Sequence, residues 1–175
     1  EMDEFSRAFD ILSRARDERI KIGHHEAAAL TQLTMAICLI EMGRISEALN
    51  ALKVCISEAK IFKSAPTEVL ALGQTARALQ FGHDWVPIWY LFGELSVPNN
   101  WNKRIVIQQA SLAVLDKCRS DGLSAGFSFG KRLLAETSVN APEVYASAVT
   151  AMWVEMVNSG VPVSLLRDLL AEVPN

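Results

Sequence analysis

Four glycines divide the chain at nearly equal intervals, and each follows a long stretch in which apolar residues recur every three or four positions. They are Gly43, Gly82, Gly122 and Gly160, and successive members stand about 40 residues apart. Such apolar spacing indicates amphipathic helices, and glycine is common just after a helix ends. A shorter helical stretch follows each glycine, so the pattern predicts helical hairpins that stack side by side. An ordinary helical bundle is the alternative.

The rest of the chain also favours helices, because no segment alternates apolar and polar residues in the way of a β-strand. We therefore predict an all-α fold of about nine helices, arranged as stacked antiparallel hairpins in an α-α superhelix. Asn140 and Glu143 have the spacing of a capping box, with Asn in place of Ser or Thr. The predicted helices cover about 2–22, 25–42, 46–62, 67–81, 86–95, 102–121, 124–137, 141–159 and 163–172.

A length of 175 residues suits one domain, which we expect to span residues 1–175. The chain begins with Glu1 rather than Met, and no secretory signal is visible. We therefore expect a fragment of a longer protein, or a chain from which a tag was cleaved. The most charged predicted helix, at 2–22, is expected to act as a cap on the array.

Charge and cysteine content exclude several classes of partner and compartment. The 17 Lys and Arg residues against 20 Asp and Glu give a net charge of −3, which argues against direct nucleic-acid binding. No uncharged apolar run approaches the length of a membrane-spanning helix, so we expect no membrane insertion. Three cysteines cannot form a complete set of disulfides, which favours a reducing, cytoplasmic location.

The hairpin around the first of the four glycines carries a specific pattern of small and large residues. Ala36 is followed by Leu39, then by Gly43 at the turn and by Ala48 five residues further on. This pattern resembles the central part of a tetratricopeptide repeat (TPR). The small residues allow the paired helices to approach closely.

The other hairpins depart from the TPR pattern. Pro87 and Phe127 stand where Ala48 would be expected, and the spacing exceeds the usual period of about 34 residues. Such longer units are similar to those in helical sensor domains of large bacterial transcriptional activators and in small helical secretion chaperones. The resemblance implies a scaffold that binds a protein or peptide, as a regulatory or assembly domain of a larger protein. A ligand-sensing regulatory domain and a secretion-type chaperone are the alternatives that it implies.

In a TPR-like array, the first helix of each hairpin lines the inner surface. With Gly43 as the turn and a shift by one glycine interval to the next hairpin, the predicted groove residues are Leu30, Leu33, Ile37, Ile40, Val69, Leu72 and Leu79. An exposed apolar surface of this size needs a cover. We expect a partner's amphipathic helix or extended segment, the first helix, or a second copy in a homodimer. In a more tightly bent array, these residues would instead be ordinary core.

The densest aromatic cluster lies just after Gly82. Trp85 and Trp89 are four residues apart on one helical face, and Tyr90 follows directly. These residues are interpreted as core between hairpins, as an exposed docking surface, or as a site for a small-molecule ligand.

No group of residues has the spacing of a catalytic or metal site. His24 and His25 are adjacent, so they point in different directions from a helix or turn. The stretch from Gly122 to Lys131 lacks the order of a phosphate-binding loop, and we expect a closely packed helix from Gly126 to Gly130. We therefore predict no enzyme activity, no cofactor and no metal.

Overall fold

A computed structural model describes residues 2–82 and 88–171, and within these residues the chain is helical, with no strand. The prediction of an all-α fold with about nine helices is confirmed. The helices are α1 (Met2–Lys21), α2 (His25–Glu41), α3 (Ile45–Ile61), α4 (Ala65–Gly82), α5 (Trp89–Phe92), α6 (Asn100–Ser111), α7 (Ala113–Asp121), α8 (Leu123–Asn140), the 3-10 helix η1 (Pro142–Val144), α9 (Tyr145–Asn158) and α10 (Val163–Ala171).

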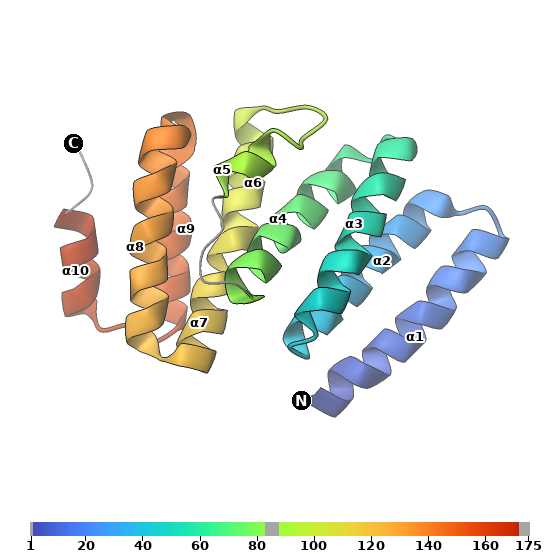
Figure 1. Cartoon of the computed structure of the whole chain (residues 1–175), viewed down its shortest axis with the longest axis horizontal. Helices are drawn as coiled ribbons and strands as arrows, with labels where there is room; N and C mark the ends of the chain where they lie inside the picture. The colour runs from blue at the N-terminus through green and yellow to red at the C-terminus, as the bar shows by residue number, and fades with distance from the viewer. Residues whose placement is uncertain (1, 83–87, 172–175) are drawn as a thin grey trace.

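The helices form an elongated row with α1 at one end and α10 at the other (Figure 1). Helices α3, α5 and α8 lie toward the viewer, whereas α2, α6 and α9 lie behind them. Along the row, α2 contacts α4, α4 contacts α6, and α6 contacts α9. This series, called here the inner row, provides the helices that form the candidate site.

The turns between the first four helices repeat one backbone geometry. After α2, the N–H of Gly43 donates to the carbonyl of Ile40 at 2.9 Å, and the N–H of Arg44 donates to the carbonyl of Leu39 at 2.8 Å. Gly43 has a φ of 71°, in the left-handed region where glycine is favoured. The same pair of bonds recurs at Gly23, Lys63 and Gly160. The turns at Gly23, Gly43 and Lys63 are evenly spaced at about half the predicted interval, so that interval contains two helices.

The apolar interior consists of two clusters that meet at α4. Leu39, Leu52 and Ala78 belong to the first cluster, which joins α2, α3 and one side of α4. Leu72 belongs to the second cluster, together with Val106 of α6 and residues of α8, α9 and α10. Since α4 contributes to both clusters, it is buried on two sides and connects the two parts of the row.

A buried arginine adds a polar connection at the same helix. Arg77 of α4 donates from Nε and Nη2 to the two carboxylate oxygens of Asp116 on α7, at 2.7 and 2.8 Å. Its Nη2 also donates to Glu41 at the end of α2, at 2.7 Å. Burial disfavours the charged guanidinium, but the hydrogen bonds and charges of Asp116 and Glu41 outweigh it and raise the pKa of Arg77. One side chain therefore ties together three helices.

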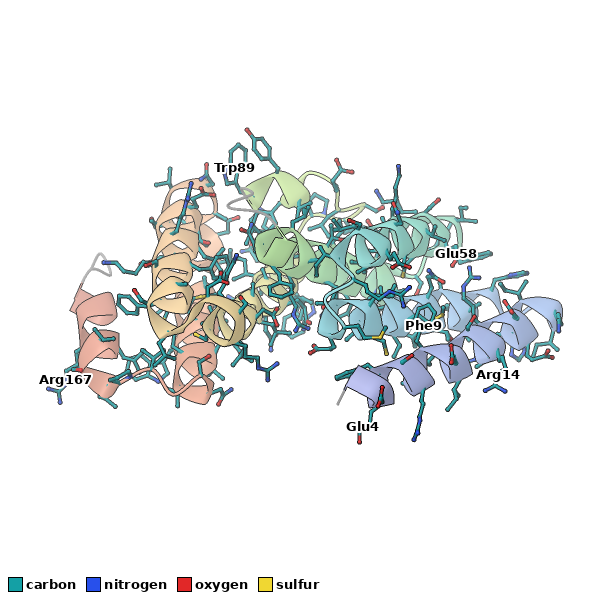
Figure 2. The ribbon with its side chains drawn as sticks, turned by 60° about the horizontal axis from the view of Figure 1, so that its bottom comes forward. Glu4, Phe9, Arg14, Glu58, Trp89 and Arg167 are labelled. Carbon is teal, nitrogen blue, oxygen red and sulfur yellow. The ribbon has the colours of Figure 1, made fainter. Side chains whose placement is uncertain are left out.

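The first helix packs along α2 and is held by both apolar and polar contacts. Phe9 packs against the first cluster, and the Arg44 guanidinium lies 5.9 Å from the centre of its ring. Figure 2 shows Phe9 where α1 faces α2. Near the other end of α1, Arg19 donates to the hydroxyl of Thr31 and to the carbonyl of Ala27.

The glycines of α8 allow close helix packing, as the sequence predicted. A Cβ added at Gly126 would lie 2.1 Å from Sγ of Cys118 and 3.0 Å from the carbonyl oxygen of Val114. A Cβ at Gly130 would lie 2.0 Å from the terminal methyl of Met156. These positions therefore bring α8 against α7 and α9 at distances that larger residues would prevent.

Several predicted boundaries were wrong for identifiable reasons. The helix expected at 102–121 is divided into α6 and α7 at Leu112, and the part of 86–95 that the structure describes contains only the short α5. Gly82 is the last residue of α4 and not a left-handed cap, and its missing side chain makes room for Ile45. The capping box is also absent. The Asn140 amide donates to the carbonyl of Glu136, and Glu143 pairs with Lys103.

Candidate functional site

Most of the groove residues predicted from the sequence are inside the protein. Leu33 and Ile40 are buried in the first cluster, and Val69 and Leu72 are buried in the second. Ile37 and Leu79 are partly buried. Leu30 is the exception, with 48 % of its surface exposed. Because adjacent helices of the row cover these faces, the predicted residues do not together form an open groove.

The aromatic residues predicted as a second site are only partly described. Trp85 lies outside the described residues. The rings of Trp89 and Tyr90 are 3.8 Å apart between centres, and Tyr90 is largely exposed whereas Trp89 packs partly on the second cluster. Trp89 is the first residue of α5 and lies at the outer edge of the molecule (Figure 2).

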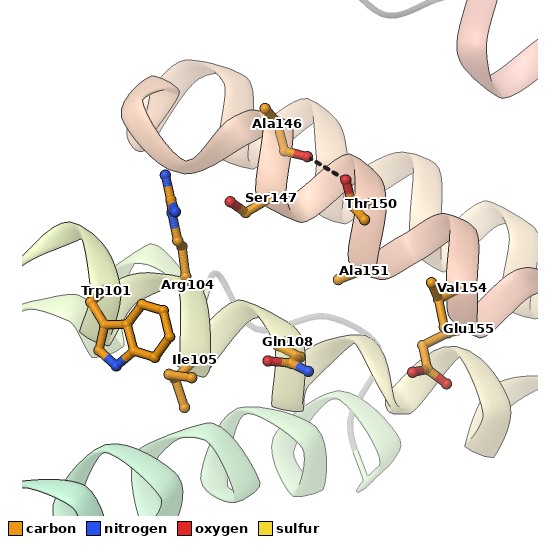
Figure 3. Close-up of a pocket in the computed structure, with 10 residues that line it drawn as sticks. All are labelled: Trp101, Arg104, Ile105, Gln108, Ala146, Ser147, Thr150, Ala151, Val154 and Glu155. Carbon is orange, nitrogen blue, oxygen red and sulfur yellow. Dashed lines mark hydrogen bonds between the residues drawn. The ribbon is translucent and has the colours of Figure 1, made fainter.

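An open hollow instead lies between α6 and α9 of the inner row, and we call it the α6–α9 groove. Its volume is about 480 Å³, within the usual range for ligand sites. Residues at helical spacing on one face of each helix line it (Figure 3). They are Trp101, Arg104, Ile105 and Gln108 of α6, and Ala146, Ser147, Thr150, Ala151, Val154 and Glu155 of α9.

A second hollow of about 330 Å³ lies beside the groove, between α4 and α6. Pro66, Val69 and Leu70 line it from α4, so Val69 is the one predicted groove residue that contributes to either hollow. Trp101 and Ile105 line both hollows. Trp101 is 68 % exposed. A large aromatic side chain thus lies in the open, between two depressions in the inner row.

Local hydrogen bonds and an ion pair position the start of α6 relative to α9. The Asn99 side chain caps α6 by accepting from the N–H of Asn102 at 2.8 Å, which places Trp101 in the first helical turn. Lys103 donates to Glu143 of η1 at 2.6 Å, and this partner lowers the pKa of the Glu143 carboxyl. The pair therefore links α6 to the segment that leads into α9.

Polar contacts also hold α4 close to α6. A Cβ added at Gly73 would lie 2.6 Å from Cβ of Gln109, so this glycine permits the approach of the two helices. The Gln74 amide donates to Oε1 of Gln109 at 2.5 Å. Gln109 of α6 and Asp116 of α7 are therefore both engaged by side chains of α4.

The two ends of the α6–α9 groove differ in charge. Arg104 is exposed near Ser147, whereas Glu155 lies at the far end of the α9 face (Figure 3). Burial raises the pKa of Glu155, Arg77 opposes that rise, and Asp116 adds to it. Oε2 of Glu155 is buried and has no hydrogen-bond partner among the described residues.

Sequence reasoning missed Trp101, Arg104 and Glu155 for a simple reason. The groove was placed by shifting positions from the first hairpin, and the shift does not hold where α5 is short and α6 ends early. Trp101 was also one residue outside the expected helix at 102–121. The spacing of Trp101, Ile105 and Gln108 by four and three residues would have placed these three on one helical face.

The lining of the groove contains no cysteine or histidine. Cys55 is buried at α3, and burial raises the pKa of its thiol to about 12. His24 and His25 are exposed, and the ring of His25 stacks on Phe62 at 5.2 Å. In the part of the chain that the structure describes, no three His, Cys, Asp or Glu residues gather to hold a metal ion.

Comparisons of the chain with family models, with curated proteins and with solved structures find no match. Among residues 2–82 and 88–171, no helix combines the length and the apolar character needed to cross a membrane.

Proposed function

We propose that this chain is a helical scaffold that binds a segment of another protein in the α6–α9 groove, as a regulatory or assembly module. The exposed indole of Trp101, which borders two adjoining hollows, carries the proposal. Tryptophan is among the residues that most often dominate the energy of protein interfaces. The helices on both sides are fixed by core packing and by the pair of Lys103 and Glu143, so the surface is formed in advance.

The lining favours a peptide over a strongly polar small molecule. Ile105, Ala151 and Val154 provide apolar surface, and Arg104 and Glu155 provide charge at separate places. The Thr150 hydroxyl donates to the carbonyl of Ala146 at 3.0 Å, so its proton is already used within α9. A chain segment can place side chains at several points of such a groove at once.

Selection from a phage-displayed library of random dodecapeptides tests the proposal. Peptides enriched on the wild-type protein are synthesised, and their affinities are measured by fluorescence anisotropy. We expect Trp101→Ala to weaken them about tenfold or more, which corresponds to about 1.4 kcal/mol. Tyr90→Ala, which removes an exposed aromatic ring outside the groove, should leave affinity unchanged. Peptides that depend on Tyr90 and not on Trp101 would contradict the proposed site.

A further inference from the structure

The charges at the two ends of the α6–α9 groove are not neutralised in the same way as the other charges of the inner row. Arg77 is shared by Asp116 and Glu41, and Lys103 is paired with Glu143. In contrast, no hydrogen bond or ion pair joins Arg104 to another described residue, and Oε2 of Glu155 has no hydrogen-bond donor among those residues. The groove therefore presents one cationic and one anionic group to whatever occupies it.

Glu155 in particular favours a cationic group from outside the fold. Its nearest influential charges are Arg77 and Asp116, which have opposite signs and are already paired with each other at 2.7 and 2.8 Å. A buried carboxylate oxygen without a donor is costly, and a donor with a positive charge relieves that cost most effectively. A lysine or arginine side chain of a bound segment would supply such a donor.

The distance between the two charged ends sets the spacing in the ligand. Ser147 and Glu155 are eight residues apart on α9, which is about 12 Å along the helix axis. Arg104 lies beside the Ser147 end of this face (Figure 3). In an extended segment, residues four apart point to the same side and are about 13 Å apart. A basic and an acidic residue at positions i and i+4 would therefore reach both ends.

The lining of the groove suits an extended segment. The short side chains of Ala146, Ser147 and Ala151 leave room for a peptide backbone along α9. In such a segment, residues four apart also match the span between the two charged ends.

We infer that the occupant of the α6–α9 groove is an extended peptide segment with a lysine or arginine at Glu155 and an aspartate or glutamate four residues away at Arg104. The inference rests on the proposed function, because it specifies the ligand of the same groove. The ligand residues between the two charges lie over Ile105 and Ala151 and are small or apolar.

The same dodecapeptide library, selected in parallel on four proteins, tests the inference. Wild type should enrich peptides with a basic and an acidic residue four positions apart. Peptides selected on Glu155→Gln should no longer be enriched in the basic residue but should still be enriched in apolar residues. Arg104→Glu should replace the acidic preference by a basic one. Arg7→Glu, a charge reversal at an exposed position on α1, should give the wild-type pattern.

Peptide variants give a second readout that needs no change to the protein. Replacing the selected lysine or arginine by glutamine should weaken binding to wild type about tenfold, and should have little effect on binding to Glu155→Gln. Peptides that require Trp101 but show no basic preference, or keep it with Glu155→Gln, would overturn the inference and leave the proposed function standing. If no enriched peptide depends on Trp101, both are overturned.

Discussion

At the scale of single residues, the carboxylate of Glu155 is not fully satisfied by its surroundings. Most buried polar groups in proteins have hydrogen-bond partners, and Arg77 in the same region has two carboxylates. Glu155 has a buried oxygen without a partner, and its pKa is raised by burial. Binding sites commonly contain residues that lower the stability of the free protein.

The raised pKa of Glu155 predicts a pH-dependent difference between wild type and Glu155→Gln. The folded state holds the carboxyl proton more tightly than the unfolded state, whose pKa is near the ordinary value of 4.5. This contribution stabilises the fold when the pH is below 4.5 and is lost as the pH rises through the folded pKa. Glutamine does not titrate, so the variant should gain stability relative to wild type as the pH rises from 4.5 through the folded-state pKa of Glu155.

Urea unfolding at several pH values measures this difference, with Glu47→Gln as the matched control. Arg44 lowers the pKa of Glu47 through a hydrogen bond, so that carboxylate contributes above pH 4.5 and loses its contribution as the pH falls. The control should therefore show a weak trend of the opposite sign, because Glu47 is fully exposed to solvent. A difference between wild type and Glu155→Gln that is flat with pH would contradict the assignment.

At the scale of helices and turns, the sequence predicts elements well wherever local chemistry decides them. The all-helical character follows from apolar spacing, and Gly43 and Gly160 take the left-handed conformation expected of them. The turn at Lys63 was not marked by a glycine, so the shorter regular interval between single turns was not recognised. The break at Leu112 and the burial of Leu33 and Leu72 depend on packing between helices. The local sequence does not determine which helices pack against each other.

Lys63 gives a prediction about the turn between α3 and α4. It has a φ of 56° and is the one described residue other than glycine with a positive φ. A left-handed conformation costs a residue with a Cβ about 1–2 kcal/mol. Glycine avoids this cost, but it loses more backbone entropy on folding, and that loss cancels part of the gain. Lys63→Gly should raise the free energy of unfolding by about 0.5–1 kcal/mol.

Chemical denaturation measures this change, and Lys63→Ala is the control because it removes the side chain but keeps the Cβ. The alanine variant should unfold close to wild type. If Lys63→Gly lowers stability, the turn does not have the geometry that it shares with Gly23 and Gly43.

At the scale of the whole molecule, the row is held together at α4, and Arg77 is its main polar contact. Removing one partner of a buried ion pair leaves the others without compensation and typically costs about 3–5 kcal/mol. Arg77→Met should therefore lower the free energy of unfolding by about 3–5 kcal/mol, because Asp116 and Glu41 would both lose their donor.

Thermal and urea unfolding followed by circular dichroism measure this loss. Lys21→Met is the matched control, since Lys21 pairs with Glu18 three residues away at the surface and its removal should change the melting temperature little. Equal stability of Arg77→Met and wild type would show that apolar packing alone holds α2, α4 and α7 together.

The double role of α4 also limits how the chain can be divided. Leu72 faces one apolar cluster and Ala78 the other, so each cluster needs the same helix to close its interior. A cut on either side of α4 would leave α4 in one fragment. The other fragment would then expose an apolar face. Residues near α1 or α10 tolerate trimming better, since only one neighbour loses its cover. Two separately produced fragments would regain a closed interior only by reassociating around α4.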